Sequence, residues 1–505
     1  MIKNSPYKDG SIERGGFSLR GSQANIIPTE PLNVPLGQRQ LIMSNQVMES
    51  CYDCHRTVHP VEKHSANPLI SGEKPWESEG LAAYGSVLYD PELGKFHLWG
   101  MIWPYEGTKE KGGLRGIYYQ SSDGLNWQRP NLGQYEYQGN KDNNLLECDF
   151  SSFGDYLALG PSAFFMPPEH TDKGRFGAVL AAVDLRVMRS PDSHGMNQFL
   201  AFSDDGQTWK LRQEHNPFFR GRNDTHQSLV WNPDRKVFMY YRRATINAKE
   251  IRRIAYTESA DLINWTQPRV VINADELDTL YLYGMTVTRY QNIYLGLLQN
   301  LYSHADHDRV KVPKSHEVDI QLTWSCDGFS WDRHPQRPIF IPTGPLRPGV
   351  PDWGGVYAFN DMIDVGDRVY VYYVGYEGLH TSLVQEKQRH LCMGTLRRDG
   401  FVSLDAPREG WALTAPLRCP GGKLHINANT AGDGVIQVAV REGEGVRDGE
   451  WPESWSLDYA TDFTGDQIDH EVNWKGQQDL SPWKGKTIRL EFRLVKASLY
   501  SFWFV

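Results

Sequence analysis

The sequence has few cysteines and no long apolar run. Six cysteines are scattered over 505 residues, and their spacing does not form a disulfide framework. No segment approaches the roughly 18 to 20 apolar residues of a membrane-spanning helix. The polar start of the chain also lacks the apolar core of a signal peptide. We therefore expect no membrane partner and a cytoplasmic protein, with an exported natural form as the alternative.

An excess of positive charge is also absent. The 53 Lys and Arg residues are outnumbered by 62 Asp and Glu residues, which gives a formal net charge of −9. This balance provides no general attraction to nucleic acid or to an anionic membrane. The sequence shows no aromatic-basic groove motif either. We expect no nucleic-acid partner, and the sequence leaves the oligomeric state undetermined.

One cysteine motif has a spacing that haem and metal proteins use. CYDCH, residues 51–55, has the form of a c-type haem attachment site, but its surroundings are β-rich and contain no small helical segment. Cys51, Cys54, His55 and His59 are close enough in sequence to bind zinc as an alternative. Coincidence is the reading that we favour, so we predict no metal ligands.

A turn motif recurs along the chain. It appears as SSDGLNWQRP at 121–130, with close variants at 202–211, 256–268 and 323–333 and a fainter copy at 396–406. Asp-Gly is a turn signal, and one catalytic site cannot require five copies of it. We predict that Asp-Gly makes the turn into an outermost strand and that the tryptophan seals the gap between adjacent units.

Each unit opens with two short segments rich in Val, Tyr, Phe and Trp around a polar turn, a pattern typical of a β-hairpin. Five such units predict a five-bladed β-propeller over residues 73–408. Alternating strands with Gly and Asp turns predict an antiparallel β-sandwich over 409–505. Residues 1–72 are polar with few periodic segments, so we expect them to wrap the propeller and reach its mouth. The predicted fold class is all-β.

This arrangement resembles glycoside hydrolase families 32, 43 and 68, especially the family 32 invertase and inulinase type. Over residues 75–505 it looks like a group of bacterial family 32-like proteins with a C-terminal sandwich. The turn SDDGQTW at 203–209 also looks like the sialidase Asp-box, but sialidases have six blades and three arginines. In RNDTHQSL, Asp224 is similar to the stabilising Asp of family 32, whereas the Asn-Asp-Pro and Glu-Cys motifs of that family are absent from their places.

Cleavage of a glycosidic bond requires two carboxyl groups. In a propeller they must lie where the innermost strands begin, because those ends converge on the axis. We select four catalytic candidates, with Glu317 and Asp319 on one strand face by period two; for each, a turn or capping role is the alternative. The four are Asp224, Asp352, Glu317 and Asp319. The predicted substrate-binding residues are His226, Tyr283, Arg242, Trp353, Tyr357, His380, Lys63, His64 and Glu79.

These residues favour a glycoside hydrolase that acts from the end of an oligosaccharide, without an organic cofactor. A phosphorylase is one alternative, because Arg242, Arg243 and Lys63 are candidates for a phosphate site. A non-catalytic carbohydrate-binding propeller is another, since a fold does not fix a function. The resemblance also implies a possible axial Ca²⁺ or Na⁺ ion, for which the sequence shows no dedicated ligand loop.

Overall fold

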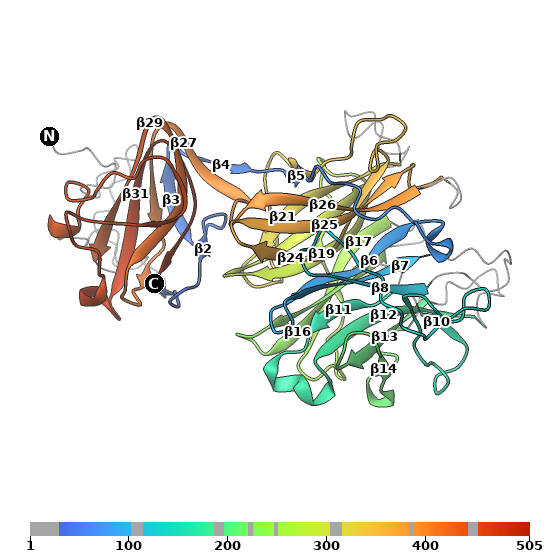
Figure 1. The fold of residues 1–505 in the computed structure, drawn as a ribbon. Coiled ribbons are helices and arrows are strands. Elements are labelled where there is room, and N and C mark those ends of the chain that lie inside the picture. The colour runs from blue at the N-terminus through green and yellow to red at the C-terminus, as the bar shows by residue number, and fades with distance from the viewer. Residues whose placement is uncertain are drawn as a thin grey trace. The chain divides into compact units, whose positions relative to one another are not determined.

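The chain is almost entirely β in the computed structural model (Figure 1). The structure describes residues 30–102, 115–158, 160–185, 196–220, 226–246, 251–302, 316–382, 388–442 and 453–505. The helices in these ranges are short 3-10 helices: η1 (Pro75–Glu77), η2 (Pro168–Lys173), η3 (Gln213–His215), η6 (Glu453–Trp455) and η7 (Ser481–Trp483). None of these described helices has the length and apolarity needed to cross a membrane.

The chain divides into two compact units. One contains residues 60–290 and 294–396, and the other contains the described part of the N-terminal 59 residues together with 291–293 and 397–505. The first unit is a five-bladed β-propeller and the second is an antiparallel β-sandwich. The predicted fold class is therefore confirmed. The chain passes between the units at 59/60, 290/291, 293/294 and 396/397. The domain boundaries at 72/73 and 408/409 stay predictions.

Each of the five blades pairs its strands antiparallel, and single parallel residue pairs, one between blades four and five and one between blades five and one, join these three blades into one sheet. Blade one contains β6 (Leu81–Asp90), β7 (Lys95–Ile102), β8 (Arg115–Ser121) and β9 (Leu145–Leu146). Blade two contains β10 (Tyr156–Ala158), β11 (Ser162–Phe165), β12 (Phe176–Asp184), β13 (Met196–Ser203) and β14 (Lys210–Leu211). Blade three contains β15 (Gln227–Asn232), β16 (Val237–Ile246), β17 (Ile251–Ser259) and β18 (Arg269–Ile272).

Blade four contains β19 (Tyr281–Tyr290), β20 (Ile293–Leu301), β21 (Val318–Ser325), β22 (Asp332–Arg333) and β23 (Ile339–Ile341). Blade five contains β24 (Gly355–Val365), β25 (Arg368–Glu377) and β26 (Gln388–Arg397), and β5 (Glu62–Lys63) from the N-terminal region adds its outermost strand. Lys63 pairs with Gly394 in this antiparallel contact. A strand from the start of the chain thus closes the ring.

The repeated turns connect neighbouring blades. In the first copy, the Asp123 carboxylate accepts the backbone N–H groups of Leu125 and Asn126, each at 2.8 Å. The carbonyl of Gly124 accepts a hydrogen bond of 2.8 Å from the Tyr372 hydroxyl of blade five. Because these groups are buried, the bond satisfies a carbonyl that water cannot reach.

The same contact recurs around the ring. Trp99 of blade one donates to the Gly206 carbonyl of blade two at 2.6 Å, and Tyr241 of blade three donates to the Gly328 carbonyl of blade four. The ring of Trp127 packs edge to face on an aromatic ring of blade five, with centroids 5.7 Å apart. The predicted packing role of the turn motif is confirmed.

The innermost strands of blades one and five are bulged near the propeller axis. Their pairing registers shift over residues 83–85 of β6 and 359–361 of β24. The Asn360 amide, in the second bulge, donates to the carbonyls of Gly85 at 3.2 Å and Gln227 at 3.0 Å. One buried side chain therefore connects blades one, three and five.

Within its described residues, the sandwich has nine strands: β1 (Leu32–Asn33), β2 (Gln40–Leu41), β3 (Met48–Tyr52), β4 (His55–Val58), β27 (Val402–Thr414), β28 (Leu417–Arg418), β29 (Leu424–Glu442), β30 (Asp466–Glu471) and β31 (Thr487–Phe504). The first four come from the segment that we expected to wrap the propeller. They pair instead with β27, β28 and β31, because the long C-terminal strands leave edges that other strands can satisfy.

The long strands β27, β29 and β31 of the sandwich are irregular at neighbouring positions. The pairing register breaks at residues 407–408 of β27 and 431–434 of β29. Lys496 of β31 lies opposite these breaks with a φ of 45°. Such bulges let one strand serve both layers of a sandwich. The enclosed core includes the fully buried Trp474 and Phe492.

Candidate functional site

Aromatic side chains meet where the innermost strands of the propeller begin. The Tyr283 hydroxyl of β19 lies 2.7 Å from that of Tyr84 in β6. The Tyr283 ring centroid lies 5.8 Å from that of Tyr357 in β24 and 5.0 Å from that of His380. Tyr84 also packs edge to face on His226, with centroids 4.9 Å apart. Four of the five blades contribute to this contact.

Local structure explains these positions. Tyr84 lies in the bulge of β6, which interrupts the alternation of side chains along the strand. His226 directly precedes β15, and Gln299 of β20 lies 3.0 Å from its Nδ1 atom. The Tyr357 hydroxyl lies 2.8 Å from the Nδ1 atom of His380, which orients both groups.

Three arginines lie over the faces of tyrosine rings at this place. The guanidinium carbons of Arg243 and Arg252 lie 5.1 and 5.0 Å from the centroid of Tyr283. That of Arg389 lies 5.2 Å from the centroid of Tyr376, at the end of β25. A guanidinium over an aromatic face is held by the ring quadrupole, so positive charge is concentrated at this place.

Three tyrosines of this group are held in their protonated form. Burial raises the pKa of Tyr84, Tyr357 and Tyr376 above the ordinary value for tyrosine. The rings of Tyr357 and Tyr376 lie 4.3 Å apart. The hydroxyl groups therefore keep their protons over the physiological pH range and can contact oxygen-rich ligands.

Glu79 supplies a carboxyl group at this place, two residues before β6. Arg389 Nη1 donates to its backbone carbonyl at 2.6 Å. Its Oε2 atom is covered and has no hydrogen-bond partner among the described residues. Burial raises the pKa of Glu79, and the charge of Arg389 opposes that effect only in part. We call the ten residues the axial cluster: Glu79, Tyr84, His226, Arg243, Arg252, Tyr283, Tyr357, Tyr376, His380 and Arg389.

The predicted catalytic carboxylates lie in different places. Asp224 lies outside the described residues. Asp352 is buried, and its Oδ2 atom accepts hydrogen bonds from Lys63 at 2.5 Å and from Tyr373 at 3.0 Å. Lys63 and Asp352 thus come together as an ion pair within blade five. Among the described residues, neither forms a hydrogen bond or ion pair with the axial cluster.

Glu317 and Asp319 lie around Tyr302 in blade four. Asp319 is buried and accepts hydrogen bonds from Tyr302 at 3.0 Å and from Asn300 at 3.2 Å. The Glu317 carbonyl accepts the Tyr302 N–H at 3.1 Å. Burial, together with the charges of Asp319 and Glu317, raises the pKa of Tyr302. The structure therefore brings these two candidates near one hydroxyl.

Three predicted substrate-binding residues have other surroundings. Arg242 lies with its guanidinium 4.8 Å from the Phe219 centroid, and burial lowers its pKa. The His64 Nδ1 atom accepts the Ala66 N–H at 3.2 Å. Trp353 is half-buried two residues before β24. Their predicted roles stay predictions.

Of the predicted binding residues, the axial cluster contains Glu79, His226, Tyr283, Tyr357 and His380. Four further members, Tyr84, Tyr376, Arg252 and Arg389, were not predicted. An arginine pair at 252–253 was visible in the sequence, but nothing there showed which arginine faces β19. Tyr84 depends on a bulge, and a bulge leaves no period-two signal.

The described residues contain no group of three or more His, Cys, Asp and Glu side chains that could hold a metal ion. Cys51 and Cys54 are free cysteines. The Cys54 thiol donates to the Trp411 carbonyl at 3.7 Å, and burial raises its pKa to about 12.

No family model and no curated protein matches the chain. Solved structures match about two thirds of it at low identity. A glycosyl hydrolase from Bacteroides ovatus is 14% identical over 67% of this chain and 94% of that chain, with a TM-score of 0.45. A β-1,2-mannobiose phosphorylase from Listeria innocua is 13% identical over 67% and 97%, with a TM-score of 0.46.

An N-acetylgalactosamine deacetylase from F. plautii is 14% identical over 72% of this chain and 94% of that chain, with a TM-score of 0.39. Similarities this weak select no activity, so the function has to be argued from the residues of the site.

Proposed function

We propose that the protein cleaves glycosidic bonds at the axial cluster. The observation that supports this proposal is the convergence, where the innermost strands begin, of tyrosine rings and hydroxyls with one carboxyl group of raised pKa. Aromatic faces pack against the C–H surface of sugar rings, and buried hydroxyls discriminate ligand hydroxyls. Membership in the family 32-like group stays part of this proposal.

Glu79 is the acid that we assign to the leaving oxygen. A carboxyl group whose pKa is raised retains its proton nearer to neutral pH, as protonation of a glycosidic oxygen requires. The second carboxyl group is Asp224 in this proposal, because it precedes His226 by two positions in the sequence. Tyr84, Tyr283 and His226 bind sugar hydroxyls.

The test is the variant Glu79→Gln, screened with wild type against plant and algal oligosaccharides and aryl glycosides. We expect the turnover number to fall by about 10²- to 10⁴-fold, because general acid catalysis contributes on this order. Glu73→Gln is the matched control, since Glu73 is exposed and pairs with Arg129 at 2.5 Å. Equal turnover by Glu79→Gln and wild type would refute the assignment.

The arginines favour a phosphorylase as the second candidate. The Arg252 Nη1 atom is covered and has no hydrogen-bond partner among the described residues, and Arg243 lies on the same tyrosine ring. A phosphorylase requires one carboxyl group and a site for phosphate, which arginine binds well. Running the same screen with and without phosphate distinguishes the two, because a phosphorylase releases a sugar phosphate and depends on the anion.

A further inference from the structure

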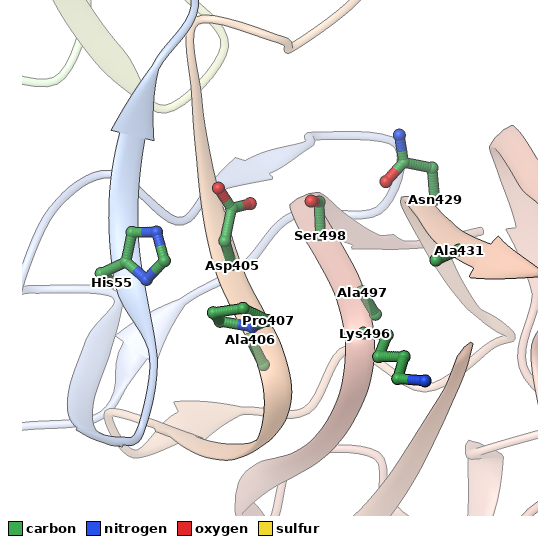
Figure 2. A pocket seen from close by; sticks show the side chains of 9 residues that line it. All are labelled: His55, Asp405, Ala406, Pro407, Asn429, Ala431, Lys496, Ala497 and Ser498. Atoms are coloured by element: carbon green, nitrogen blue, oxygen red, sulfur yellow. The ribbon is translucent and has the colours of Figure 1, made fainter. Parts of the chain in front are cut away.

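The sandwich has a pocket of about 440 Å³ at the level where its long strands bend. Its lining residues come from β4, β27, β29 and β31 (Figure 2). The volume lies within the range of small-molecule sites. The pocket belongs entirely to the sandwich unit.

Strand register aligns four polar side chains across this pocket. His55 pairs with Asp405, Asp405 with Ser498, and Ser498 with Asn429. Residues directly opposite each other in a sheet project to the same face. Figure 2 shows the four side chains on neighbouring strands. His55 is the histidine of the CYDCH motif, so this motif supplies a pocket residue.

The Asp405 carboxylate is the central group of this row. Its Oδ1 atom is covered and has no hydrogen-bond partner among the described residues. The nearby cations have other partners: Lys496 pairs with Asp433 at 2.5 Å and Arg397 with Asp466 at 2.5 Å. A covered carboxylate oxygen without a donor is unfavourable. A ligand that donates hydrogen bonds would remove this penalty.

The remaining surface indicates the chemical class of the ligand. The bends supply exposed apolar groups from Pro407 and Ala431, whereas Ala406 and Ala497 also line the pocket but pack in the sandwich core. The Asn429 amide and the Ser498 hydroxyl both donate and accept hydrogen bonds. Apolar groups beside hydrogen-bond donors and acceptors match a pyranose ring, which has C–H patches and vicinal hydroxyls. Asp405 disfavours an anionic ligand.

We propose that this pocket is a second saccharide-binding site, which takes a neutral pyranose whose hydroxyls donate to Asp405. The site goes beyond the proposed cleavage at the axial cluster and does not depend on it. Its function would be to hold a saccharide on the sandwich, whether or not the propeller cleaves glycosides.

The test uses the full chain with D-glucose, D-galactose, D-mannose and L-fucose as probes. Saturation-transfer NMR reports binding, and hydrogen exchange by mass spectrometry locates it. We expect one or more of these sugars to bind and to protect peptides that contain Asp405 and Ser498. Asp405→Asn should weaken binding at least about tenfold, a difference of 1.4 kcal/mol, because the amide accepts more weakly than the carboxylate.

Ser498→Ala is a second variant that should weaken binding without removing a charge. Asp458→Asn, at an exposed position of the same unit, is the matched control and should bind as wild type does. The proposal is overturned if none of the four sugars binds, or if protection appears only in propeller peptides. It is also overturned if Asp405→Asn binds unchanged, or if methylammonium binds at Asp405 and the sugars do not. A negative result here leaves the Glu79→Gln experiment unaffected.

Discussion

Asp361 is a carboxyl group whose ionisation opposes folding. It lies in the bulge of β24 at a φ of 75°, a left-handed conformation that Asp and Asn tolerate better than most residues. Burial raises its pKa to about 7, and a hydrogen bond to Thr288 opposes this in part. In the unfolded chain its pKa is close to the ordinary value of 3.8. The folded protein therefore binds a proton here that the unfolded chain releases.

The sign of the pH dependence follows from linkage. The stability contributed by protonated Asp361 is fully present below about pH 4 and is lost as the pH rises to about 7, with a slope of up to ~1.4 kcal/mol per pH unit. Asp361→Asn should remove this slope and be more stable than wild type at about pH 8. Urea denaturation of wild type and Asp361→Asn between about pH 4 and pH 8 measures the free energy of unfolding of each. Parallel stability curves for the two proteins would contradict the prediction.

At the scale of elements, the repeated turns stabilise the seams between blades. Tyr372→Phe removes the donor to the Gly124 carbonyl and leaves that buried group without a partner. We expect a loss of about 1 to 2 kcal/mol in the free energy of unfolding, measured by urea denaturation. Tyr370→Phe, two residues earlier on the same strand, is the control. If both variants lose the same free energy, the hydrogen bond does not stabilise the seam.

The sequence could predict these elements because their signals are local. Asp-Gly and the following tryptophan recur with each blade, and hairpins show as alternating aromatic and β-branched residues around polar turns. The axial cluster was predicted only in part. The sequence could predict the positions of His226, Tyr283 and Tyr357, because these residues lie where inner strands begin. Arg389 lies instead on the third strand of blade five. Its approach to Tyr376 is set by blade packing, which leaves no local pattern.

At the scale of the whole molecule, the sequence could not predict which distant strands pair with each other. Strands β1 to β4 join the sandwich and β5 closes the propeller, although all five lie in one polar segment. Two-residue strands such as β5 carry no periodicity. Lys63 and Asp352 illustrate the consequence. Each was predicted as a site residue on its own, and only ring closure brings the half-buried Lys63 and the buried Asp352 together as an ion pair.

This ion pair allows a test of ring closure. Lys63→Met leaves the Asp352 carboxylate buried, and among the described residues the Tyr373 hydroxyl is then its remaining side-chain donor. We therefore expect a loss of about 2 to 4 kcal/mol in the free energy of unfolding. Exchange protection of the peptide that contains β5 should fall as well. The double variant Lys63→Met with Asp352→Asn should recover more than half of that loss, because no unpaired charge remains buried.

Two other outcomes of the Lys63→Met and Asp352→Asn experiment would contradict the structural role of the ion pair. If the two single losses add in the double variant, the pair does not couple β5 to blade five. If Lys63→Met instead abolishes glycoside cleavage while the free energy of unfolding is unchanged, the two residues act on substrate, as the sequence predicted. Because the ion pair has its own partners within blade five, we expect stability to change first and activity to follow only where the ring opens.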